Sequence, residues 1–197
     1  MRTYKINEIF YSIQGEGEHT GKAAVFIRFS GCNLKCPFCD TDFKAFVESS
    51  AEQIVERVKE LGKDCRFVVL TGGEPTLQAD IRLVDMLHEA GYYVAMETNG
   101  TKPVMIPVDW VTVSPKQPFV GSVGTPYIRK ANEVKVVFDG INVPSTFGIE
   151  AEHYYLQPCD TGDKQKNERI LQECLKYILA QPKWKLSLQT QKIINVR

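Results

Sequence analysis

Three cysteines crowded into eight residues set the first limit on this chain. Cys32, Cys36 and Cys39 stand in the segment GCNLKCPFCDT with the spacing C-x3-C-x2-C, and Phe38 directly precedes the last of them. A [4Fe–4S] cluster is normally held by four cysteine thiolates. This run supplies three, so it predicts a cluster with one iron open to another ligand, which is a place for chemistry.

Two other uses of clustered cysteines stay open at this point. A closed structural zinc site takes four ligands, usually as two spaced pairs, and only Cys36 and Cys39 have that spacing. A disulfide or redox pair is the third use, but the first residues contain no apolar run of signal-peptide length. The other cysteines and the histidines show no ligand spacing and are predicted to be structural: Cys65, Cys159, Cys174, His19, His88 and His153.

Size and charge favour one domain with no polyanionic partner. The 197 residues predict a single domain over 1–197, and 43% apolar residues are enough for a core. Lys plus Arg and Asp plus Glu number 24 each, so no net field attracts nucleic acid or an anionic membrane. No apolar run reaches the ~18 residues of a membrane span. We therefore expect a cytoplasmic protein, with neither nucleic acid nor membrane as a partner.

Short apolar, β-branched segments alternate with helical patterns along the chain. Such alternation is typical of an α/β fold with a mainly parallel sheet. Strands are expected over 23–29, 67–70, 92–96, 110–113, 133–138, 154–157 and 186–188, and helices over 52–61, 81–88 and 170–178.

Polar, glycine-rich segments follow five successive predicted strands: GCNLKCPFCDT, TGGEPT, ETNGT, SPK and QPCD. Ligands gather at the carboxyl ends of parallel strands, so these segments predict one functional rim. A complete eight-unit βα barrel needs ~250 residues. Because the chain is shorter and its later connections are poor in helix, we predict an incomplete, open and shortened TIM-like barrel.

These motifs resemble the radical S-adenosylmethionine superfamily, in which the three-cysteine loop follows the first barrel strand and GGEP the second. More narrowly, the chain resembles the 7-carboxy-7-deazaguanine synthase family over nearly its whole length. The segments that carry this likeness are INEIFYSIQGEG, FIRFSGCNLKCPFCDT, VVLTGGEPTLQ, METNGT, VTVSPK, LQPCD and WKLSLQTQK.

The resemblance implies that Cys32, Cys36 and Cys39 hold a [4Fe–4S] cluster, with S-adenosylmethionine on the open iron. One-electron reduction then yields methionine and a 5′-deoxyadenosyl radical. Glu74 would accept from the amino group of the cofactor, and Phe38 would lie near its adenine. The implied cofactor-binding set is Phe38, Cys39, Asp40, Gly72, Gly73, Glu74, Ser114, Pro115, Lys116, Gln157 and Pro158.

The implied substrate is 6-carboxy-5,6,7,8-tetrahydropterin, which a lyase of this family converts to 7-carboxy-7-deazaguanine by radical ring contraction with loss of ammonia, in queuosine biosynthesis. Arg28 can grip its carboxylate in a bidentate fork. From the residues alone an exposed surface arginine is the alternative, although the apolar strand around Arg28 disfavours it. The implied substrate-binding set is Ile13, Gln14, Gly15, Glu16, Arg28 and Thr71.

The resemblance also implies Mg²⁺ at Thr41, a one-electron reductant such as flavodoxin, and a homodimer. From chemistry alone, Thr41 reads as a turn residue. The family pattern leads us to expect a histidine where Gln191 stands. The resemblance therefore does not imply a substrate contact by the Gln191 side chain. Two rivals stay open: a small radical enzyme that activates a partner protein, and a non-catalytic zinc or electron-transfer module.

Overall fold

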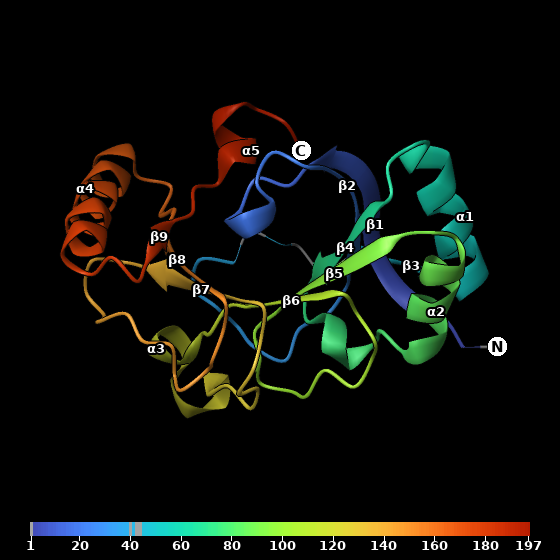
Figure 1. Ribbon diagram of the computed structural model, residues 1–197, viewed down its shortest axis with the longest axis horizontal. Helices are drawn as coiled ribbons and strands as arrows, with labels where there is room; N and C mark the ends of the chain where they lie inside the picture. The colour runs from blue at the N-terminus through green and yellow to red at the C-terminus, as the bar shows by residue number, and fades with distance from the viewer. Residues whose placement is uncertain (1, 40, 42–44) are drawn as a thin grey trace.

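The computed structural model describes residues 2–39, 41 and 45–197, and its strands form a single curved sheet (Figure 1). The described strands lie in the order β3-β1-β2-β4-β5-β6-β7-β8-β9. They are β1 Tyr4–Ile13, β2 Ala23–Phe29, β3 Val47–Ser49, β4 Phe67–Gly72, β5 Tyr93–Thr98, β6 Trp110–Val113, β7 Glu133–Phe138, β8 His153–Pro158 and β9 Lys185–Leu186.

The sheet has the parallel, open form that the sequence predicts. From β2 through β4 to β9 every neighbouring pair is parallel, whereas β1 pairs antiparallel with both β2 and β3. Among the described residues the sheet begins at β3 and ends at β9, which do not pair with each other. The prediction of an incomplete TIM-like barrel is therefore confirmed.

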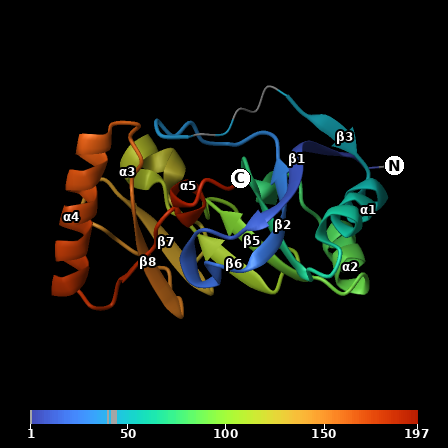
Figure 2. The same cartoon turned by 90° about the horizontal axis from the view of Figure 1, so that it is seen from above.

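Helices cover the outer face at the two ends of this sheet (Figures 1 and 2). The three longest helices begin at side-chain caps: Ser50 and Gln53 form a reciprocal capping box at α1, and Asp80 and Asp163 cap α2 and α4. The helices are α1 Ala51–Gly62, α2 Ile81–Glu89, α3 Gln117–Val120, α4 Lys164–Ala180 and α5 Thr190–Ile193, with short 3-10 turns η1 Gly17–His19, η2 Pro75–Leu77 and η3 Gly121–Gly124.

Alternation along the strands divides the core between the two faces. In β4, Val68 and Leu70 pack in the cluster that also contains α1 and α2 residues, while Val69 packs in a separate cluster with Phe10 and Phe26. The rings of Phe10 and Phe26 stack at 4.9 Å between centroids. This second cluster fills the inside of the barrel at the amino ends of the strands.

The loop that contains η1 closes the same end of the barrel from inside. The ring of His19 lies 4.5 Å from that of Trp110 and meets Phe67 edge to face at 4.9 Å. Among the described residues, these rings fill the interior at the amino ends of the strands, which leaves the carboxyl ends for a site.

Most predicted elements lie close to their expected bounds, and the exceptions are informative. The last strand is Lys185–Leu186 rather than 186–188, and β1, β3, α3 and α5 were not predicted. The connections after β6 and β7 were expected to be poor in helix. The one from β7 to β8 contains no described helix, whereas the one from β6 to β7 contains the short helix α3 and the turn η3. No helix among the described residues has the length and apolar character needed to cross a membrane.

Candidate active site

Inward-facing positions change from apolar to polar toward the carboxyl end of the strands. Phe26 is followed by Arg28 in β2, and Ala95 by Glu97 in β5. Strand register aligns Arg28 with Thr71 and Glu97 with Thr112 across neighbouring strands. Because inward residues recur with a period of two, these side chains form one polar layer above the apolar interior.

This polar layer is the floor of a cavity of about 310 Å³. The cavity walls include every described residue that the sequence analysis assigned to cluster, cofactor, substrate or Mg²⁺, apart from Glu74 and Pro115. Asp40, also in the predicted set, lies outside the described residues. Loops far apart in the chain are thus brought to one site, as the rim prediction required.

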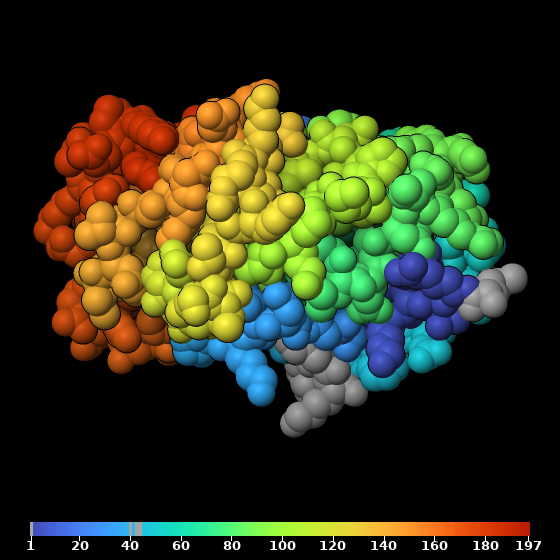
Figure 3. Space-filling view, turned by 90° about the horizontal axis from the view of Figure 1, so that it is seen from below, coloured from blue at the N-terminus to red at the C-terminus, as the bar shows by residue number. Residues whose placement is uncertain are grey.

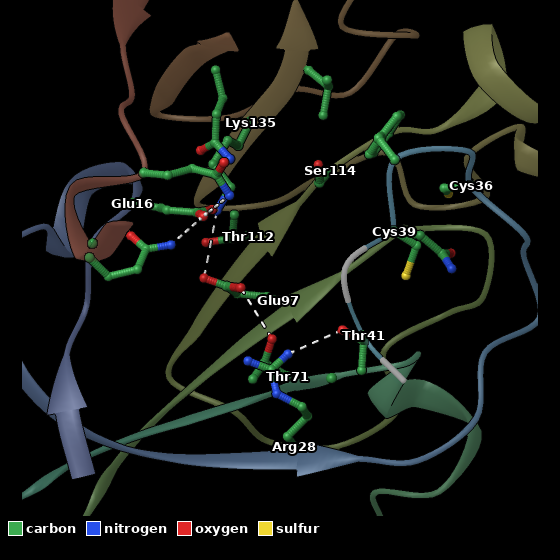
Figure 4. Close-up of a pocket in the computed structure, with 18 of the residues that line it drawn as sticks. Glu16, Arg28, Cys36, Cys39, Thr41, Thr71, Glu97, Thr112, Ser114 and Lys135 are labelled. Carbon is green, nitrogen blue, oxygen red and sulfur yellow. Dashed lines mark hydrogen bonds and ion pairs between the residues drawn. The ribbon is translucent and has the colours of Figure 1, made fainter. Parts of the chain in front are cut away.

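The three cysteines lie on one loop after β2, here called the cluster loop, and all face this cavity. The Sγ atom of Cys32 accepts from the backbone N–H of Leu34 at 3.4 Å, and burial raises the pKa of the Cys32 and Cys36 thiols. Figure 4 shows Cys39 and Thr41 along this loop. Three thiols on a cavity wall, with open space beside them, fit a cluster that leaves one iron accessible.

The cluster loop packs against the segment that contains α3 (Figure 3), where its blue surface meets the yellow one. There the ring of Phe38 meets that of Phe119 edge to face, at 4.7 Å between centroids. This contact fixes the orientation of Phe38 beside the third cysteine.

Gly72 and Gly73 let the second rim loop touch the start of the cluster loop. Gly72 has a φ of +110°, and a Cβ on Gly73 would lie 1.8 Å from the carbonyl oxygen of Gly31. Gly73 N–H donates to Phe29 at 2.9 Å. The two glycines therefore lock the two loops together in addition to lining the cavity.

Glu74 stands behind the cavity wall, and its contact with the cofactor amino group stays a prediction. It is fully buried, and its Oε1 accepts from the Thr76 and Thr98 hydroxyls at 2.7 and 2.6 Å, while its Oε2 accepts from the Asn99 N–H at 2.8 Å. These bonds make Glu74 the brace between the GGEP and ETNG loops. Pro115 is also absent from the cavity walls and shapes the turn between Ser114 and Lys116.

Lys116 holds the next rim loop in place. Its ammonium donates to the carbonyl and hydroxyl oxygens of Ser114, the former at 2.8 Å, and burial lowers its pKa to about 8. Both residues face the cavity near the cluster loop.

A buried ion network crosses the polar layer (Figure 4). The ammonium of Lys135 lies 2.5 Å from the Oε2 of Glu16 and 3.7 Å from the Oε1 of Glu97. Glu97 also accepts from Gln14 at 2.9 Å and from Thr71 at 3.3 Å. Although burial opposes it, the Lys135 charge holds the pKa of Glu16 at about 2, so Glu16 is an anion at neutral pH.

Glu133 lies below this network and should make stability depend on pH. Burial raises its pKa to about 7, against the attraction of Lys135. Because the folded-state pKa is raised, the contribution of Glu133 to stability is fully present below the unfolded-state pKa near 4.5. That contribution is lost as the pH rises through 7. Glu133→Gln keeps an acceptor for the Glu18 N–H, so it should raise the free energy of unfolding at pH 8 by roughly 2–3 kcal/mol and leave pH 4 unchanged.

Urea unfolding at both pH values measures this effect, with the exposed Glu48→Gln as the control. An equal increase in the free energy of unfolding of Glu133→Gln at pH 4 and at pH 8 would show that Glu133 does not titrate in this range.

Arg28 is a cavity residue rather than a surface arginine. Its side chain is 25% exposed, its Nε donates to Glu8 at 2.9 Å, and its Nη1 lies 3.4 Å from the Thr41 hydroxyl. The rest of its guanidinium fork is available to a ligand in the cavity.

Comparison with known proteins places these features in a family. Residues 26–118 match the model of the Radical SAM superfamily. The chain is 49% identical over 193 residues to 7-carboxy-7-deazaguanine synthase of Bacteroides thetaiotaomicron, covering 98% of each chain, and 39% identical to that of Burkholderia multivorans, covering 98% and 99%. The protein belongs to the 7-carboxy-7-deazaguanine synthase family. The crystal structure of QueE from Escherichia coli superposes with a TM-score of 0.76 and 29% identity over 95% of this chain and 94% of that one.

Membership of the 7-carboxy-7-deazaguanine synthase family confirms the predicted resemblance and, with it, the [4Fe–4S] cluster, S-adenosylmethionine and Mg²⁺ as the family's cofactors. It also decides against the structural zinc and disulfide interpretations of the cysteine run. The thiols of Cys32, Cys36 and Cys39 supply the three thiolate ligands that such a cluster takes from the protein.

Sequence reasoning did not assign Glu97 or Lys135 to the site, and it left the role of Gln191 open. Gln191 belongs to the C-terminal residues 187–197, here named the tail segment. Gln189 and Gln191 of the tail donate to the Oε1 of Glu16 at 3.1 and 3.0 Å, and Gln191 faces the cavity. The inward position of Lys135 in EVKVVF was a usable signal, because Glu133, Lys135 and Val137 alternate along one face.

Proposed function

We propose that the protein converts 6-carboxy-5,6,7,8-tetrahydropterin to 7-carboxy-7-deazaguanine by radical ring contraction with loss of ammonia. The observation that carries this proposal is one cavity that joins a three-cysteine loop to Arg28 and Glu16, in a chain of this family. The cluster and S-adenosylmethionine, when bound, supply a 5′-deoxyadenosyl radical that takes hydrogen from C6 of the substrate.

Around the cofactors, the chain provides positioning and insulation. Cys32, Cys36 and Cys39 would hold the cluster, and the adjoining walls would hold S-adenosylmethionine. We assign the remaining cofactor contacts to Phe38, Gly72, Gly73, Ser114, Lys116, Gln157 and Pro158, all of which face the cavity.

On the opposite side, the polar layer would hold the pterin. Arg28 would bind the carboxylate, while Gln14, Glu16 and Thr71, beside Ile13 and Gly15, would contact the ring. Glu16 is a suitable acceptor for ring N–H groups because its low pKa keeps it ionised. A one-electron reductant such as flavodoxin, a cytoplasmic location and a homodimer complete the proposal.

Arg28→Lys should weaken substrate binding selectively. Lysine keeps the charge but loses the planar fork, so a bidentate contact becomes a single one. One charge-assisted hydrogen bond is worth about 1.5–3 kcal/mol, which corresponds to a rise in KM of roughly 10- to 100-fold. Steady-state kinetics measure it, and cleavage of S-adenosylmethionine without substrate should be unaffected. Unchanged KM would remove Arg28 from the substrate site.

Thr41→Val should uncouple turnover from Mg²⁺. The Thr41 hydroxyl faces the cavity beside Arg28, and Mg²⁺ keeps most of its ligands as water and substrate oxygens. Wild-type activity should fall on chelation and recover with added Mg²⁺, while Thr41→Val loses most of that response and retains the cluster spectrum. A variant that responds to Mg²⁺ like the wild type would leave Thr41 as a turn residue.

Anaerobic reconstitution with iron and sulfide, followed by product analysis, tests the proposed function. With S-adenosylmethionine, a reductant and the pterin, the protein should form 7-carboxy-7-deazaguanine. Cleavage of S-adenosylmethionine only in the presence of a partner protein would favour the activating-enzyme rival, and a stable cluster without any cleavage would favour an electron-transfer module.

A further inference from the structure

Glu8 binds two arginines that both face the cavity. Its Oε1 accepts from the Nε of Arg28 at 2.9 Å, and its Oε2 pairs with the Nη2 of Arg197. Both arginines line the cavity, whereas Glu8 stands behind them. One carboxylate therefore links strand β2 to the tail segment.

A β-bulge brings Glu8 to this position. In the β1–β2 pair, Ile6 is opposite Phe29 on the outer, helix-covered face, but the register shifts after Ile6 and places Glu8 opposite Arg28. The extra residue thus turns Glu8 and Phe10 to the inside of the barrel. Without it, alternation would carry Glu8 with Ile6 to the outer face.

The two guanidinium groups both lie close to one buried ring, that of Phe10. The Cζ atoms of Arg28 and Arg197 lie 5.7 and 5.3 Å from the centroid of Phe10. Like charges brought together beside an apolar surface repel unless an anion lies between them. Glu8 supplies one such anion from behind, and each fork keeps N–H donors that it does not use on Glu8.

We propose that Arg197 is the second arm of a clamp for the substrate carboxylate, and that Glu8 is the positioning residue that sets both arms. The hydroxyl of Ser12 donates to the Arg197 carbonyl at 2.6 Å, which fixes the backbone of the second arm against β1. This inference rests on the proposed function, because that function supplies a carboxylated pterin.

Binding of two pterin probes tests the clamp on the reconstituted protein with S-adenosylmethionine. 6-Carboxypterin carries the carboxylate, and pterin lacks it. Arg197→Met and Glu8→Gln should each weaken binding of 6-carboxypterin about tenfold, the effect of one charge-assisted hydrogen bond, and leave binding of pterin unchanged. Turnover should show the same rise in KM with kcat retained. Glu60→Gln, which breaks an exposed Arg57 ion pair, is the matched control.

The sign of the Glu8→Gln effect separates positioning from simple charge. If Glu8 only competed with the substrate for the arginines, its neutralisation would tighten binding of 6-carboxypterin. Tighter or unchanged binding, or equal losses for both probes, would overturn the clamp. A wild-type protein that shows no preference for 6-carboxypterin would overturn the proposed function itself, and the clamp with it.

Discussion

Alanine at Cys32, Cys36 or Cys39 is expected to abolish cluster assembly and all cleavage of S-adenosylmethionine. The three thiols share one loop and one cavity, so each is one of three protein attachments for the cluster. Loss of one leaves a cluster with two, which should not persist. Iron and sulfide content and the visible absorption of the reconstituted variants measure the loss.

Cys65→Ala is the matched control for the cysteine variants. The Cys65 thiol donates to the Ala23 and Phe67 carbonyls and does not line the cavity, so it should be dispensable for the cluster. An alanine variant at Cys32, Cys36 or Cys39 that retained a full complement of iron would contradict the assigned ligand set.

Lys135→Met should be among the most destabilising single substitutions in the protein. Methionine fills a similar volume but removes the ammonium between Glu16 and Glu97. Breaking a buried ion pair by removing one partner costs about 3–5 kcal/mol, because the remaining charge is left without compensation. Urea denaturation at pH 7 measures the free energy of unfolding.

Lys185→Met provides the comparison for Lys135→Met, since Lys185 makes a partly exposed pair with Glu18 at 3.4 Å. Exposed pairs contribute about 0–1 kcal/mol, so this variant should remain close to the wild type. The loss of unfolding free energy in Lys135→Met should also shrink at low pH, where the Glu16 carboxylate left without its partner takes up a proton. Similar stability of the two variants at pH 7 would contradict the buried network.

The parallel strands could be predicted because their apolar, β-branched runs record burial on both faces of a sheet. β1 could not, because the bulge after Ile6 shifts its alternation near the start of the strand. β3 and α5 are short, and they are held by strand pairing and by polar contacts with distant segments, which local periodicity does not record.

The site residues also divide into those that local sequence reveals and those that only the fold reveals. Cys32, Arg28 and the glycine-rich loops were predictable because their chemistry or their backbone needs are written in short motifs. Glu97 and Lys135 were not, because their importance lies in distances between β5, β7 and the loop that contains Glu16. The bracing role of Glu74 was missed for a related reason: its motif marks the loop, but only the fold shows that neighbouring hydroxyl and N–H groups donate to its oxygens.

Isotope transfer from the substrate tests the central claim most directly. Reconstituted protein would be given the pterin deuterated at C6, and the mass of the released 5′-deoxyadenosine would be measured. We expect 5′-deoxyadenosine that carries deuterium, together with 7-carboxy-7-deazaguanine. Formation of 5′-deoxyadenosine without deuterium, and without the deazaguanine product, would contradict the assignment of this cavity to the pterin reaction.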